Sequence, residues 1–127
     1  MKQYKFKEKA KNLKESKIPD LVIWPGNSAK DFGKDYDQLY DLSYNGPMIS
    51  PKDEMTPSAW DAGFEIKGNN FIIQGGVDSN GFGNVEITLP KKSVKDYYEI
   101  LIQPRSQEDY DAITEILSKY GWIFKEY

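Results

Sequence analysis

The sequence predicts an α+β fold, in which a single domain of 127 residues combines an antiparallel β-sheet with helices packed on one side of it. Apolar and polar residues alternate between residues 62 and 89, which is typical of strands with one solvent-exposed face. Tyrosine, isoleucine and leucine recur every three or four residues between 106 and 120, which is typical of an amphipathic helix. The chain length is that of one domain, so we expect residues 1–127 to share one core.

Residues 1–17 form a lysine-rich segment that precedes the first predicted strand. Phe6, Ala10 and Leu13 are spaced as on one face of a helix, and lysines cover the other faces. A short strand is the alternative, because aromatic residues alternate with lysines at the start of this segment. We therefore expect an N-terminal helix or arm that ends before Pro19.

A buried strand and a helix are predicted next. Residues 21–24 are β-branched, aliphatic and aromatic, and the Pro-Gly pair that follows them ends the strand. Ser28 stands three residues before Asp31, as in a capping box, and apolar residues at helical spacing follow to about residue 42. Residues 43–58 are rich in proline and turn-forming residues, and we expect a loop there.

Period-two alternation predicts a three-stranded antiparallel meander. Its strands cover residues 64–67, 71–74 and 85–89, and turn residues separate them. The second turn contains Asn80-Gly81, the dipeptide most typical of hairpins.

The C-terminal third predicts a strand, a helix and a second strand. A helical turn that begins at Ser93 should lead into a strand that ends near Gln103, with a continuous helix as the alternative. Ser106 is positioned to cap the following helix, and Gly121 stands where a helix C′ glycine is expected. Residues 122–124 then predict a terminal strand.

Composition excludes several classes of chemistry. The chain has no cysteine and no histidine, which rules out disulfides, thiolate nucleophiles, cysteine-based metal sites and Ser–His or Cys–His catalysis.

Residues 1–17 carry seven lysines and two glutamates, whereas residues 18–127 carry ten basic and eighteen acidic side chains. An acidic body repels nucleic acid and attracts basic proteins. No apolar run is long enough to cross a membrane, and we expect a cytoplasmic protein without membrane contact.

Two carboxylate patterns in the sequence bear a weak similarity to metal sites. Residues 78–86 place oxygen donors at alternate positions, but they lack the glutamate and the flanking helices of a calcium loop. Glu65 and Lys67, with Asp20 and Asp61 upstream, could serve a Mg²⁺-dependent nuclease. An exposed strand face explains the same spacing, so we expect no catalytic residue, no metal and no cofactor.

The most suggestive segment lies between residues 31 and 44, where aspartates and tyrosines are interleaved. On a helix, four aspartates this close repel one another, and a basic partner would relieve that repulsion. An ordinary surface helix is the alternative explanation. Our candidate partner-binding residues are Asp35, Asp37, Asp41 and Tyr44.

In this acidic body and this Asp/Tyr segment, the chain resembles the immunity proteins of bacterial polymorphic toxin systems, including contact-dependent growth inhibition systems. The resemblance lies in general character, because immunity proteins share no common fold. It implies a non-enzymatic inhibitor that binds a cognate toxin 1:1, commonly a nuclease, and occludes its active site. A small regulatory or adaptor domain with another protein partner is the alternative, followed by the Mg²⁺-dependent nuclease.

Overall fold

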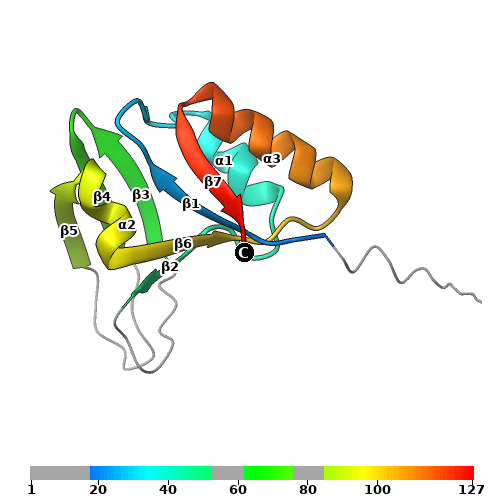
Figure 1. The fold of residues 1–127 in the computed structure, drawn as a ribbon, viewed down its shortest axis with the longest axis horizontal. Helices are drawn as coiled ribbons and strands as arrows, with labels where there is room; N and C mark the ends of the chain where they lie inside the picture. Colours follow the sequence, from blue (N-terminus) through cyan, green and yellow to red (C-terminus); the bar gives the residue numbers. More distant parts are fainter. Residues whose placement is uncertain (1–17, 53–61, 76–84) are drawn as a thin grey trace, which may run out of the picture.

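Two antiparallel sheets and three α-helices form the described part of the chain in the computed structural model, which describes residues 18–52, 62–75 and 85–127. The four-stranded sheet has the order β2-β6-β1-β7, with bounds Met48–Pro51, Tyr98–Ile102, Leu21–Pro25 and Trp122–Glu126. The three-stranded sheet has the order β3-β4-β5, with bounds Ala62–Lys67, Asn70–Gly75 and Val85–Pro90. The helical segments are α1 (Asp35–Asp41), the 3-10 turn η2 (Lys91–Ser93), α2 (Val94–Tyr97) and α3 (Gln107–Lys119). Figure 1 shows the three-stranded sheet at one end of the molecule and α3 at the other.

The predicted α+β class is confirmed, but two sheets replace the single expected sheet. The predicted antiparallel meander is confirmed as β3-β4-β5, and its register places Phe64 opposite Ile73 and Phe71 opposite Leu89. The four-stranded sheet instead joins strands that are far apart in sequence, with Leu21 opposite both Ile102 and Glu126. The expected N-terminal helix or arm over residues 1–17 lies outside the described residues.

Two local predictions are wrong. The predicted loop over 43–58 contains β2, which pairs only with β6 at an edge of its sheet. Proline is tolerated there, because an edge strand leaves one side of its backbone unpaired. The predicted helix from Ser28 begins only at Asp35, because the Asp31 carboxylate accepts from the Gly33 and Ile66 backbone N–H groups at 3.2 and 3.0 Å instead of joining a capping box.

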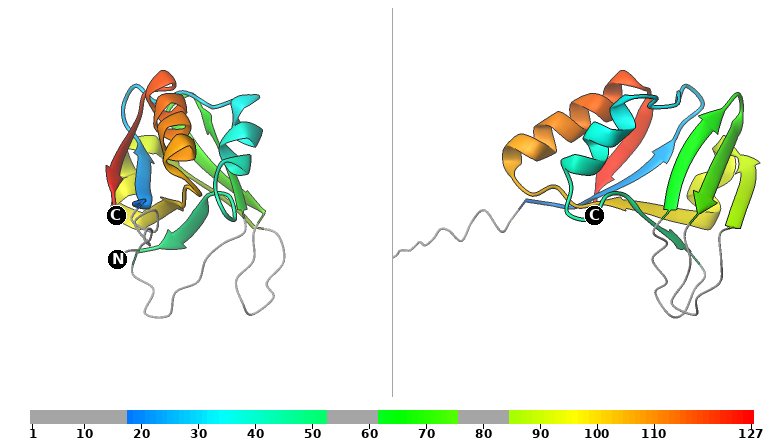
Figure 2. Two further views of the ribbon diagram at one scale, coloured as in Figure 1. Left: turned by 90° about the vertical axis from the view of Figure 1, so that its right-hand side faces the viewer. Right: turned by 180° about the vertical axis from the view of Figure 1, so that it is seen from behind.

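The core lies between the four-stranded sheet and α3, and it continues under the three-stranded sheet. Ile23 of β1 and Ile100 of β6 lie opposite each other, and both are almost fully buried. Ile113 and Leu117 come from the buried stripe of α3 and are fully buried. Figure 2 shows α3 and α1 side by side on the same side of β1 and β7. Burial of apolar surface at about 25 cal/mol per Å² is the main force that holds α3 in place.

An aromatic cluster joins α1, the three-stranded sheet and β7. The Phe32 ring stacks on the Trp122 ring with centroids 4.8 Å apart, and the Phe64 ring lies 5.4 Å from the Trp122 ring. The Tyr36 ring of α1 meets the Phe64 ring edge-on at 5.3 Å. Aromatic pairs at these distances stabilise a core beyond the area that they bury. The cluster therefore fixes α1 against both sheets.

The ends of α3 follow the sequence prediction. The Ser106 hydroxyl accepts from the Asp109 N–H at 3.1 Å, as an N-cap does. Gly121 follows the helix with φ +77°, the left-handed conformation expected at C′. In the described ranges, no helix is long and apolar enough to cross a membrane.

Candidate partner-binding surface

The exposed face of α1 carries two carboxylates one helical turn apart. Leu39 is fully buried and holds the opposite side of the helix in the core. At 100° per residue, Asp37 and Asp41 project away from Leu39, and both are exposed. Neither carboxylate is hydrogen-bonded or ion-paired to another residue in the part of the chain that the structure describes. Like charges at i and i+4 repel, and Lys34, three residues before Asp37, is the basic residue nearest to them in sequence.

Asp35 behaves differently from the other two aspartates. Its carboxylate accepts from the Tyr120 hydroxyl at 2.5 Å and from the Lys119 ammonium at 3.0 Å, and its side chain is 29% exposed. The hydrogen bond from Tyr120 is the main reason that the pKa of Asp35 lies below its ordinary value, and the bond from Lys119 is the second. The same contacts raise the pKa of both Lys119 and Tyr120. Asp35 therefore ties α1 to the end of α3.

Two tyrosines extend the exposed face of α1. Tyr40 is 43% exposed, and its ring lies directly over Gly46, where a Cβ atom would overlap the ring. Gly46 also has φ +73°, so both the conformation and the close approach require glycine there. Tyr44 is 62% exposed, and its N–H donates to the Gln103 carbonyl at 3.0 Å. The backbone is therefore held at both positions, by α1 at Tyr40 and by the bond to Gln103 at Tyr44.

Hydrogen bonds to β3, to the end of α3 and to β7 hold the segment before α1 in place. Asp31 links the segment to β3 through the Ile66 N–H. The Lys30 N–H donates to the Tyr120 carbonyl at 2.8 Å, and the Lys30 carbonyl accepts from Trp122 Nε1 at 2.9 Å. These bonds cross more than thirty residues of sequence, and with the aromatic cluster they hold α1 in one position.

The four predicted binding residues thus have two roles in the structure. Asp37, Asp41 and Tyr44 are exposed at α1 and just beyond it, and we call them, together with Tyr40, the α1 surface. Asp35 contacts α3 instead. The helical spacing of Tyr36 and Tyr40 in the sequence predicts that both rings belong to one apolar stripe. The short α1 leaves its ring at the margin of the core, where it stays partly exposed.

The candidate residues of a Mg²⁺-dependent nuclease do not lie together in the described structure. Asp20 precedes β1 in the four-stranded sheet, whereas Glu65 and Lys67 belong to β3 in the other sheet. Asp61 and most of the segment weighed as a calcium loop lie outside the described residues. Within residues 18–52, 62–75 and 85–127, no three acidic side chains gather as a metal site would require.

Comparisons with protein-family models, curated proteins and solved structures gave no match to this chain.

Proposed function

We propose that this chain is a non-enzymatic inhibitor that binds a basic protein partner through the α1 surface. The observation that carries the proposal is the pair Asp37 and Asp41, two exposed carboxylates one turn apart that bond to no other described residue, on a helix that is held from its other side. Complementary charge across an interface accelerates association and selects the partner. The pair repels itself in the free protein, and a cationic partner removes that cost.

The exposed tyrosines make the same surface suitable for a protein partner. Tyrosine supplies a large apolar ring with a polar tip and is enriched where protein interfaces are strongest. Tyr40 and Tyr44 flank the end of α1 that bears Asp41. A basic groove on a partner could therefore bury the rings while its cations meet the carboxylates.

The partner we propose is a cognate bacterial toxin domain, in line with the resemblance to immunity proteins. Toxin nucleases bind phosphates in cationic clefts, and side-chain carboxylates can occupy such clefts in place of the substrate. Binding 1:1 over the cleft would block the substrate without chemistry on either protein. A rigid α1 favours this mode, because little conformational entropy is lost on binding.

The first experiment is a pull-down of the tagged full chain from its native host, with mass spectrometry of the eluted proteins. The proposal expects one stoichiometric basic protein, whose toxicity returns when this chain is removed. An acidic or non-toxic partner would contradict the proposal.

The second experiment tests the surface itself. The double variant Asp37→Lys/Asp41→Lys should associate at least about tenfold more slowly with the recovered partner at low salt, because attraction becomes repulsion. Asp111→Lys/Glu115→Lys is the matched control, since it makes the same change in net charge one turn apart on the exposed side of α3. Equal rates for the two double variants would show that overall charge, and not the α1 surface, governs association.

A further inference from the structure

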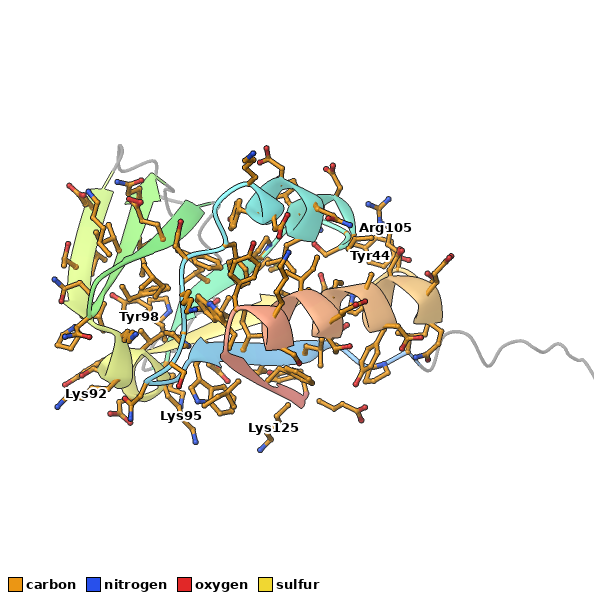
Figure 3. All side chains as sticks on the ribbon, turned by 90° about the horizontal axis from the view of Figure 1, so that it is seen from above. Tyr44, Lys92, Lys95, Tyr98, Arg105 and Lys125 are labelled. Atoms are coloured by element: carbon orange, nitrogen blue, oxygen red, sulfur yellow. The ribbon has the colours of Figure 1, made fainter. Side chains whose placement is uncertain are left out.

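The four-stranded sheet has a second face, which α3 does not cover. The strand register places Val22 and Trp24 of β1 beside Lys125 and Ile123 of β7 on this outer face. All four side chains are half-buried or exposed. In Figure 3, Lys95 and Lys125 project on one side of the molecule, while α1, Tyr44 and Arg105 lie on the opposite side. The outer face is therefore separate from the α1 surface.

A shallow pocket of about 270 Å³ lies on this outer face. Val22 and Trp24 contribute apolar lining, and Lys52, Lys95 and Lys125 contribute ammonium groups. Among the charged residues that line the pocket are also Glu99 and Glu126, but the Glu126 carboxylate accepts from the Tyr110 hydroxyl of α3 at 2.9 Å. The lining therefore carries three ammonium groups against two side-chain carboxylates, a surplus of one positive charge in a chain whose net charge is -3.

One edge of the same sheet offers free backbone groups beside this pocket. β7 pairs with β1 and, among the strands of residues 18–52, 62–75 and 85–127, has no neighbour on its other side. The Tyr127 N–H donates to the Asp20 carbonyl at 2.8 Å. Because every second residue of an antiparallel strand bonds to the same neighbour, this bond shows which residues of β7 bond to β1. Residues 123 and 125 therefore bond to β1, whereas the main-chain groups of Trp122, Phe124 and Glu126 point to the open edge.

We propose that the β7 edge and the outer face together bind an extended acidic segment of a second protein partner by strand addition. The backbone of the segment would pair with Phe124 and Glu126, and alternate side chains would lie over the outer face. Apolar side chains would contact Val22 and Ile123, and carboxylates would meet Lys95 and Lys125. Backbone pairing supplies affinity in this mode, and the pocket supplies selectivity.

The lining favours an acidic protein segment over a nucleic acid. The Lys95 ammonium lies 4.7 Å from the centroid of the Trp24 ring, so a cation already covers that ring, on which a base would stack. The single arginine of the sequence, Arg105, which would be the preferred reader of phosphates and bases, lies on the opposite side of the molecule. Carboxylates alternating with apolar side chains match both the lysines and the period-two geometry of an added strand.

The test begins with selection of a displayed library of random decapeptides on the immobilised full chain. The proposal expects enriched peptides in which acidic and apolar residues alternate. A selected peptide labelled with fluorescein then reports affinity by anisotropy. Lys95→Glu/Lys125→Glu should weaken its binding at least about tenfold. Lys30→Glu/Lys67→Glu is the matched control with the same change in net charge on exposed residues elsewhere, and it should leave the affinity unchanged.

Two measurements test strand addition without changing the protein. Binding should slow hydrogen exchange at the Phe124 and Glu126 amides, which point to the open edge. N-methylation of alternate peptide residues should abolish binding in one register and spare it in the other, since only one register bonds to β7. Failure to enrich acidic peptides, equal affinity for both double variants, or unchanged exchange at those amides would each overturn the proposal. Concentration-dependent dimerisation through β7 would overturn it as well, by assigning the edge to a second copy of the chain.

Discussion

Replacement of Gly121 by alanine tests whether the turn between α3 and β7 fixes the segment that leads to α1. Gly121 has φ +77°, and a Cβ atom there would lie 2.6 Å from the Ser28 carbonyl oxygen. That oxygen belongs to the backbone, so the segment around Ser28 would have to move. The left-handed conformation costs alanine about 1 kcal/mol, and forcing the backbone apart adds about 1–3 kcal/mol. We expect a total loss of about 2–4 kcal/mol in the free energy of unfolding.

Gly68 provides the matched control for this substitution. It has φ +61°, but nothing lies within 4 Å of a Cβ atom built there. Gly68→Ala should therefore lose only the conformational part, about 1 kcal/mol. Urea unfolding followed by tryptophan fluorescence measures both variants. With a slope of about 1.5 kcal/mol per M, the midpoints should fall by about 2 M for Gly121→Ala and about 0.7 M for Gly68→Ala. Equal midpoints would refute the argument that Ser28 and Gly121 are in obligatory contact.

Three further substitutions probe contacts that hold the helices. Asp35→Asn should reduce stability near neutral pH, because the pKa of Asp35 is lowered in the folded state by its bonds to Tyr120 and Lys119. The wild-type advantage should be present above about pH 4 and vanish as pH falls through the lowered pKa, so urea midpoints that differ equally at pH 2 and pH 6 would contradict the assignment. Ser106→Ala should cost about 1 kcal/mol by calorimetry, and Ser106→Asp, which keeps the cap, should not. Phe32→Leu should cost about 2 kcal/mol through lost aromatic contacts, whereas Tyr97→Leu, at a ring that is 58% exposed, should stay within about 0.5 kcal/mol of wild type; similar costs for both would contradict the role of the aromatic cluster.

Local periodicity accounts for what the sequence could predict of the fold. The meander over β3, β4 and β5 and the capped helix α3 depend on side-chain spacing and turn residues within each segment. The division into two sheets depends instead on pairs such as Leu21 with Glu126, which are a whole domain apart in sequence. β2 was missed because Pro47 just before it and Pro51 at its end are typical of loops, and only its pairing with β6 makes it a strand.

The candidate site divides in the same way. The exposed positions of Asp37 and Asp41 follow from the 3.6-residue period and from Leu39, which the sequence contains. The contact of Asp35 with Lys119 spans 84 residues and could not be predicted from local spacing. Sequence reasoning treated all the aspartates of the segment alike, but the fold neutralises one of them and leaves two without a partner in the described structure.

The fold also places acidic and basic side chains that are mixed along the sequence on different sides of the molecule. Counted together, residues 18–127 are acidic, and that count predicts one basic partner. In three dimensions, α1, which carries Asp37 and Asp41, lies on the opposite side of the molecule from Lys95 and Lys125 (Figure 3). A chain with two faces of opposite sign orients an approaching charged protein before contact, because each face attracts one sign of charge and repels the other. On the binding proposals made above, a basic partner would be steered toward α1 and away from β7, and an acidic segment could reach the β7 edge while α1 is occupied.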